Sequence, residues 1–206
     1  MSFQISNDFG DYNWVLDSNY DKKLLDYVTL TNCFTEKECD LINEYGFVKY
    51  GKDIHPAQTT SGLNNEVRKS NVVMFPNDDK ETSWIFNKLS DVINNINRQV
   101  YNYDLKCIEL LQFTNYDSTD RGYYKKHVDS LYGILSRKLS FTLQLSDENS
   151  YEGGDLCLYF NHEPDKMLKQ RGSITFFPSY VLHEVTPVTK GTRNSLVGWV
   201  LGPDFK

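Results

Sequence analysis

The second half of the chain is the part of the sequence that most limits what it can fold into. From Leu105 onward it contains only short segments of strand character, and turn-forming residues separate each segment from the next. The expected strands cover residues 108–113, 122–129, 138–145, 156–160, 173–177, 181–188 and 193–201. Short strands in such a succession are typical of a sandwich or a barrel.

One of these segments, 138–145, alternates strictly between apolar and polar residues. Because successive side chains of a strand point to opposite faces, we expect one apolar and one polar face. The apolar positions are Leu139, Phe141, Leu143 and Leu145, and the polar ones are Lys138, Ser140, Thr142 and Gln144.

The first half of the chain predicts two helices. Thr35 and Glu38 have the spacing of a capping box, so a helix should begin there and run through Glu44. Apolar residues recur at helical spacing over 80–101, which predicts the second helix. The other elements expected are strands at 27–30 and 72–75, a polar loop over 48–65 and a loosely attached arm of about 20 residues at the N-terminus. We therefore expect an α+β chain whose helices cover one outer face of the sheet.

Length and composition limit the class of protein. A chain of 206 residues fits a single domain, with 1–104 as arm and supporting helices and 105–201 as the strand core. A net charge of −6 argues against nucleic-acid and anionic-membrane binders, which depend on positive surfaces. Four cysteines without zinc spacing, no leader and no long apolar run predict a soluble, cytoplasmic protein.

The first candidate site residues are His127 and Asp129, two residues apart in an expected strand. Alternate residues of a strand share a face, so the two side chains should lie a few ångströms apart. The same spacing also fits an exposed histidine beside a solvated carboxylate, and it arises by chance in roughly a third of such chains.

A second histidine, His183, lies within an apolar, strand-forming segment. A buried imidazole there needs a partner, either a structural hydrogen bond or a metal ion. Together with His127 and Asp129 it would complete the two-histidine, one-carboxylate set of non-haem Fe(II) enzymes, and Zn²⁺ can use the same ligands. The remaining histidines, His55 and His162, are expected to be exposed.

Arg193 follows His183 by ten residues and begins the last expected strand. An arginine inside an apolar barrel is costly unless it meets an anion, and its planar fork suits a carboxylate. A dicarboxylate co-substrate needs such a group, whereas a zinc hydrolase does not. The alternative is a structural ion pair with one of the 28 acidic residues.

These residues, in this order, resemble the Fe(II)/2-oxoglutarate-dependent dioxygenases, and the surrounding motifs are similar to the prolyl 4-hydroxylase branch, including its small bacterial and viral members. The resemblance covers residues 27–201. Its motifs are R-x-S at 68–70, E-x-L-Q-x-x-x-Y at 109–116, H-x-D at 127–129, segments 137–145 and 151–156, and H-E-V-x-P-V-x-x-G-x-R at 183–193 with Trp199 beyond. Many members have Lys at the position of Arg193, so the superfamily is better matched than the branch.

The resemblance implies a double-stranded β-helix, a relative of the jelly roll. It implies that His127, Asp129 and His183 hold Fe(II), and that Arg193 and Tyr116 bind the distal carboxylate of 2-oxoglutarate. The positions that match the substrate groove are Arg68, Ser70, Glu109, Arg137 and Trp199.

The implied reaction is hydroxylation of an unactivated C–H bond with O₂, releasing succinate and CO₂, and with ascorbate as an additional reductant. A carboxylate at Asp129 predicts hydroxylation, because related halogenases have a small residue there. The implied substrate is a proline-containing peptide or protein.

Three alternatives remain open from the sequence. An alkylated-base demethylase would have a second arginine after Arg193 and a basic groove, and this acidic chain has neither. A non-catalytic jelly-roll module could bind a peptide or a sugar in the same cavity. An oxygenase of the same kind could act on a small molecule.

Overall fold

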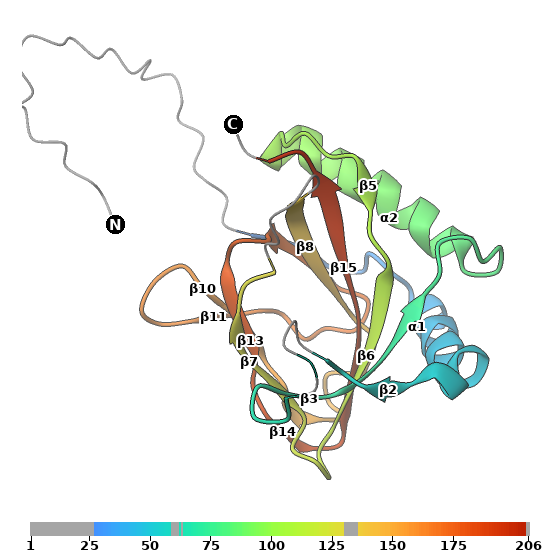
Figure 1. The fold of residues 1–206 in the computed structure, drawn as a ribbon, viewed down its shortest axis with the longest axis vertical. Helices are drawn as coiled ribbons and strands as arrows, with labels where there is room; N and C mark the ends of the chain where they lie inside the picture. The colour runs from blue at the N-terminus through green and yellow to red at the C-terminus, as the bar shows by residue number, and fades with distance from the viewer. Residues whose placement is uncertain (1–26, 59–61, 63, 130–135, 205–206) are drawn as a thin grey trace, which may run out of the picture.

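The computed structural model describes residues 27–58, 62, 64–129 and 136–204. The predicted N-terminal arm lies outside these residues. Two antiparallel sheets face each other, and the helices lie on the far side of the larger one (Figure 1). The helices are α1 (Glu36–Glu44) and α2 (Ser83–Ile96). This arrangement confirms the expected α+β chain with helices on one outer face.

The larger sheet, called the major sheet here, has eight strands. Their spatial order is β1 (Val28–Leu30), β12 (Ile174–Pro178), β8 (Ser136–Gln144), β15 (Thr192–Gly202), β6 (Leu111–Asp117), β4 (Asn71–Phe75) and β2 (His55–Pro56), with β5 (Cys107–Ile108) paired to β15. The N-terminal half therefore contributes three strands to this sheet, β1, β2 and β4, in addition to the two helices.

The smaller, minor sheet has five strands. Their order is β11 (Asp165–Lys166), β10 (Leu156–Tyr159), β13 (Leu182–Val185), β7 (Tyr123–His127) and β3 (Arg68–Lys69). A separate pair joins β9 (Glu152–Gly153) to β14 (Val188–Lys190). The chain crosses from the minor to the major sheet between β3 and β4.

The helices begin and end for local reasons. Thr35 accepts a hydrogen bond from the backbone N–H of Glu38 at 3.2 Å and donates its own N–H to the Glu38 carboxylate at 2.7 Å, which confirms the capping box. The second helix starts at Ser83, three residues later than predicted, because Asp79 accepts the backbone N–H of Glu81 and holds a turn there. After Ile96 it continues as a π-helical turn, Asn97–Tyr101.

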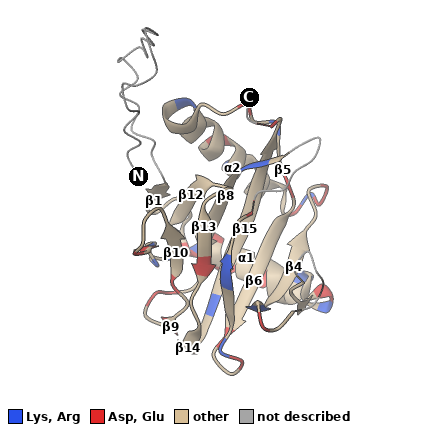
Figure 2. Cartoon of the chain, turned by 60° about the vertical axis from the view of Figure 1, so that its left-hand side comes forward, with Lys and Arg blue, Asp and Glu red and all other residues tan. Residues whose placement is uncertain are grey.

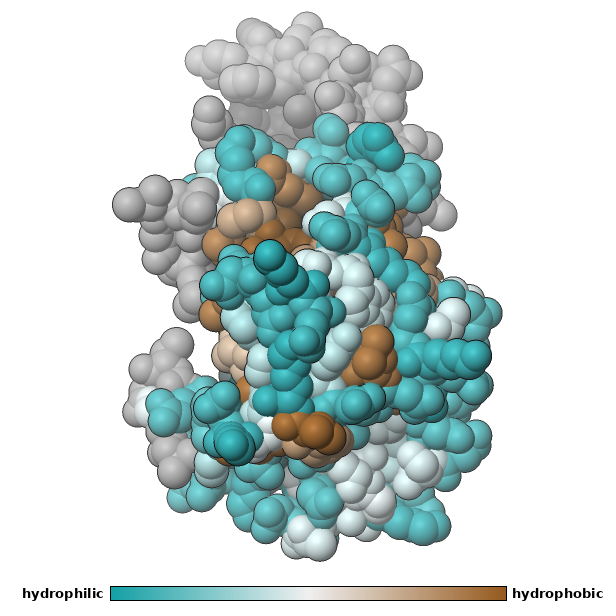
Figure 3. Space-filling view, turned by 90° about the vertical axis from the view of Figure 1, so that its right-hand side faces the viewer, coloured by the Kyte–Doolittle hydropathy of each residue, from teal (hydrophilic) through white to brown (hydrophobic). Residues whose placement is uncertain are grey.

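Apolar side chains of both helices pack on the outer face of the major sheet. The core they form includes Cys39, Ile42, Ile85, Leu89 and Ile93 from the helices and Leu111, Phe113, Leu139, Phe141 and Leu143 from the sheet. Figure 3 shows the outside of this part as largely hydrophilic, with separate hydrophobic areas. Burial of the apolar stripe is therefore what attaches the helices to the sheet.

Two predicted segments differ from the structure. Residues 181–188 do not form one strand but divide into β13 and β14, because Thr186 bonds through its backbone N–H to Asp155 and Pro187 has no N–H to donate. The predicted loop over 48–65 contains a 3₁₀ turn, Gly51–Asp53, and the edge strand β2. Both corrections reflect pairing with residues far away in the chain.

Charged residues are interspersed along the loops and strands (Figure 2). None of the helices within the described residues combines the length and apolar character needed to cross a membrane.

Candidate metal centre

Three potential metal ligands meet on the minor sheet. His127 at the end of β7 lies directly opposite His183 on β13, and Asp129 follows two residues after His127. The Asp129 backbone N–H donates to the Ser179 carbonyl at 2.9 Å, which anchors the chain beyond β7. Asp129 lies 3.7 Å from His127 Nε2 and 3.4 Å from His183 Nε2. One ligand atom from each of the three residues lies within 4.8 Å of the others, so one cation could contact all three.

Hydrogen bonds orient each of these side chains. His127 Nδ1 lies 2.8 Å from the Lys125 carbonyl, and His183 Nδ1 lies 2.9 Å from the Val181 carbonyl. Since a carbonyl only accepts, each Nδ1 carries the proton, and Nε2 of a neutral ring is left with a free lone pair. Ser140 Oγ donates to Asp129 Oδ2 at 2.8 Å. Metal-binding imidazoles and carboxylates in proteins are held in this way.

The charges of the three groups depend on one another. Burial, with the nearby His183, lowers the pKa of His127 to about 4. Burial alone would raise the pKa of Asp129, but His183 and His127 outweigh it and hold that pKa well below its usual range. Burial lowers the pKa of His183, but Asp129 outweighs this effect and raises it. A bound cation would take the place of the proton on His183.

The three residues line a cavity of about 230 Å³ between the two sheets. The Tyr124 ring stacks on His127 with centroids 3.5 Å apart, and Phe177 contacts the edge of His183. The other lining residues are Gln58, Arg68, Gln112, Tyr116, Arg137, Thr142, Leu156, Val185, Val197 and Trp199. The cavity is smaller than the usual 300–1,000 Å³ of small-molecule pockets, so it suits a group of about one residue.

Arg193 lies on β15 opposite Tyr116 of β6, and Tyr116 lines this cavity. Only 1% of the Arg193 surface is exposed, and its Nε and Nη2 have no hydrogen-bond partner. Its remaining hydrogen bond, Nη1 to Ser195 Oγ, is long at 3.4 Å. No carboxylate lies within 4 Å of it among the described residues, so the structural ion pair considered from the sequence has no partner there.

The Tyr151 hydroxyl is also buried and lacks a hydrogen bond of normal geometry, and it interacts electrostatically with Arg193. A Cβ added at Gly154 would lie 3.0 Å from Arg193 Cδ and 3.4 Å from the Tyr151 ring, so both side chains flank this glycine. Buried donors without acceptors are rare in folded proteins. A carboxylate bound between them would satisfy both, which fits the dicarboxylate expected from the sequence.

Of the five residues expected at the substrate groove, three line the cavity: Arg68, Arg137 and Trp199. Glu109 does not, but it accepts two hydrogen bonds from Arg137, at 2.7 and 3.0 Å. The guanidinium of Arg137 also lies 3.8 Å above the Trp199 ring. Glu109 therefore positions Arg137 rather than facing the cavity itself.

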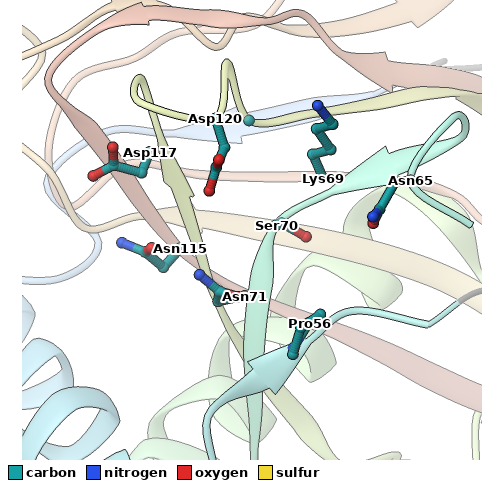
Figure 4. A pocket seen from close by; sticks show the side chains of 9 residues that line it. Pro56, Asn65, Lys69, Ser70, Asn71, Asn115, Asp117 and Asp120 are labelled. Carbon is teal, nitrogen blue, oxygen red and sulfur yellow. The ribbon is translucent and has the colours of Figure 1, made fainter. Parts of the chain in front are cut away.

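The fifth, Ser70, accepts a hydrogen bond from Arg68 Nε at 2.8 Å. It lies in the wall of a neighbouring polar pocket of about 270 Å³, beside Lys69 and Asn71 (Figure 4). Ser70 thus orients Arg68 from outside the cavity.

Sequence reasoning missed several residues of this site. Ser140 and Ser179 hydrogen-bond to each other beside Asp129, Tyr124 stacks on His127, and Tyr151 approaches Arg193. The only signal for Ser140 was its place on the polar face of the alternating strand. Tyr151 directly precedes the Glu-Gly-Gly motif, but nothing local marks its hydroxyl as unpartnered.

Comparison with known proteins extends this picture. A family model described as the 2OG-Fe(II) oxygenase superfamily matches residues 111–201. A PKHD-type hydroxylase from Crocosphaera subtropica is 32% identical over 188 residues, which cover 84% of this chain and 77% of the relative. A PKHD-type hydroxylase from Prochlorococcus marinus strain NATL2A is 33% identical over 148 residues, 68% of this chain and 63% of the relative. The chain therefore spans less than two thirds of some of the curated relatives it matches.

Solved structures share the fold at low identity. A prolyl-4-hydroxylase from Pseudomonas putida matches with a TM-score of 0.70 and 18% identity, covering 87% of this chain and 94% of that one. A prolyl hydroxylase from Trichoplax adhaerens, in complex with a hypoxia inducible factor peptide fragment, also has a TM-score of 0.70, at 17% identity over 86% of this chain and 84% of that one. The double-stranded β-helix implied by the sequence is confirmed. The chain belongs to the 2OG-Fe(II) oxygenase superfamily.

Proposed function

We propose that this chain is a hydroxylase that uses Fe(II), 2-oxoglutarate and O₂ and acts on a peptidyl residue, in the first instance a proline. One observation carries the proposal: three metal-ligating atoms within 4.8 Å of one another line a cavity, and the buried Arg193, opposite Tyr116 of the cavity wall, has no acidic partner among the described residues. The metal ligands and Arg193 would bind the two ends of a dicarboxylate, one end through the metal and the other through the guanidinium.

His127, Asp129 and His183 would hold the metal. Two imidazoles and one carboxylate suit Fe(II) and leave three coordination positions for other ligands. When bound, Fe(II) supplies the activation of O₂ and of the co-substrate. The Lys125 and Val181 carbonyls keep each Nε2 directed at the metal position, and Ser140 keeps Asp129 in its orientation.

Arg193 and Tyr151 would bind the distal carboxylate of 2-oxoglutarate, with Tyr116 beside them. Arg193 lies opposite Tyr116 and has two nitrogens without a partner, and Tyr151 offers its hydroxyl. Charge-assisted hydrogen bonds to a carboxylate in such a dry place are strong. These residues would therefore set the depth at which the co-substrate is held.

Arg137, Trp199 and Tyr124 would shape the substrate side of the cavity. Arg137 is fixed by Glu109 and stacks on Trp199, so both side chains form a rigid wall. A rigid, residue-sized cavity suits one side chain of an extended peptide. The prolyl hydroxylases of the same fold, one of them solved with a bound peptide, support proline as the residue to test first.

The test is anaerobic addition of Fe(II) and 2-oxoglutarate, followed by aeration with proline-rich peptides. We expect a visible charge-transfer band, then succinate and a mass gain of one oxygen on the peptide. His127→Ala should abolish both band and succinate, whereas the control His162→Ala, at an exposed position, should leave them unchanged.

Full turnover by His127→Ala would contradict the metal assignment. A wild-type protein that forms no band and no succinate would indicate a binding module instead.

A further inference from the structure

Arg68 is a charged side chain inside the cavity that has no acidic partner within the described residues. It lies on β3, only 6% of its surface is exposed, and it lines the same cavity as the metal ligands. No carboxylate lies within 4 Å of it among the described residues. The internal segments outside those residues, 59–61, 63 and 130–135, contain no Asp or Glu.

The few contacts of Arg68 hold the guanidinium in place without neutralising it. Nε donates to Ser70 Oγ at 2.8 Å, and Cζ lies 4.5 Å from the centroid of the Tyr124 ring. The two terminal nitrogens make no hydrogen bond within the described part of the chain. The side chain is therefore pre-oriented, and its fork remains available to a ligand.

Comparison of the three arginines of the site singles out Arg68. Arg137 is neutralised by Glu109, and Arg193 has the position proposed for the co-substrate carboxylate. Arg68 has neither kind of partner. Its guanidinium lies above the Tyr124 ring, and that ring stacks directly on His127. An anion at Arg68 would thus lie next to the metal side of the cavity, where the reacting carbon must be.

We propose that Arg68 binds a carboxylate of the substrate, so that the preferred substrate carries a carboxylate adjacent to the residue that is hydroxylated. The inference rests on the proposed function and specifies its substrate class. A backbone carbonyl could accept a hydrogen bond from the fork, but an anion would also compensate the positive charge of this largely buried side chain. The carboxylate can belong to an acidic side chain, to a peptide C-terminus or to a free amino acid.

Matched substrate pairs test the proposal and separate these sources. The pairs are proline peptides with Glu or Gln beside the proline, peptides ending in proline as the acid or the amide, and free L-proline with prolinamide. We expect wild-type protein to prefer the charged member of at least one pair by roughly 10- to 100-fold in kcat/KM, mainly through KM.

Variants then assign the preference to Arg68. Arg68→Gln should reduce it to near unity, and Arg68→Lys should restore part of it, because Lys keeps the charge but loses the fork. The control is Lys69→Gln, which removes the same charge from the adjacent, exposed position of β3 and should leave the preference unchanged.

The Fe(II)·2-oxoglutarate band and substrate-independent succinate formation are measured in every variant. If wild-type protein shows neither, the proposed function fails. If it shows both but does not prefer the charged member of any pair, or if Arg68→Gln keeps the preference, only the inference about Arg68 is overturned.

Discussion

The two faces of the major sheet differ in what makes them buried. On β8, the outward side chains Leu139, Phe141 and Leu143 pack against the helices, whereas the inward Ser140 and Thr142 are buried between the sheets. On the outer face these side chains are buried mainly by apolar contact. The inner face is polar and buried, so each of its groups needs a hydrogen-bond partner.

The chain supplies only some of those partners. Most buried side-chain polar atoms without a partner in the described residues belong to residues on or near the inner side: Gln144, Tyr151, Arg193 and Trp199. Trp84, on α2, is the exception on the helix side. The difference is that the unsatisfied buried polar groups of the described residues gather on the inner side, where a bound ligand could supply their partners.

A substitution on the outer face should damage stability and spare the site. Phe141→Ala removes a fully buried ring from the helix-facing core, so we expect a loss of about 3–5 kcal/mol in the free energy of unfolding. Denaturant unfolding measures it. The KM for 2-oxoglutarate of the folded fraction should stay close to the wild-type value; a large rise would show that the two faces are not independent.

A substitution on the inner side should do the reverse. Arg193→Gln removes a buried charge that has no acidic partner, so the free energy of unfolding without ligand should not fall. Affinity for 2-oxoglutarate should fall by about 2–5 kcal/mol, because a buried charge pair is lost. Calorimetric titration under anaerobic conditions measures this loss. Unchanged affinity, or strong destabilisation of the unliganded protein, would assign Arg193 a structural role instead.

A smaller effect is expected at Ser140, which supports a ligand without being one. Ser140→Ala removes the hydrogen bond to Asp129 Oδ2, and we expect Fe(II) affinity to fall about 10- to 100-fold. Metal titration followed by the anaerobic band measures this change. The exposed Ser150→Ala is the control and should leave metal affinity unchanged. Equal affinity in both variants would mean that Asp129 is oriented without Ser140.

Much of the fold could be predicted because its causes are local. The Thr35–Glu38 capping box, the apolar repeat of the second helix and the alternation over 138–145 each depend on residues within a few positions of one another. The predictions were wrong where pairing with residues far away in the chain determines the secondary structure. Residues 181–188 divide between two sheets, and the edge strand β2 lies in a segment that reads as loop.

The candidate site was predictable to a different extent. The spacing of His127 and Asp129, and the resemblance to a family, indicated the three potential ligands and Arg193. The structure brings the three ligands to one cavity and pairs Arg193 with Tyr116 of its wall. Neither could show that Ser70 lies outside that cavity or that Tyr151 lies near Arg193. Those relations depend on how strands far apart in the sequence are paired.

By itself, the sequence determined which side chains face the helices and which face the interior, because alternation along a strand is a property of the backbone. Only the tertiary structure decided which inward polar groups are neutralised and which are left open. Arg137 meets Glu109 from 28 residues away, whereas no acidic residue reaches Arg68 or Arg193 within the part of the chain that is described. Whether a buried charge is compensated depends on which residues lie near it in space, and the sequence order does not show this.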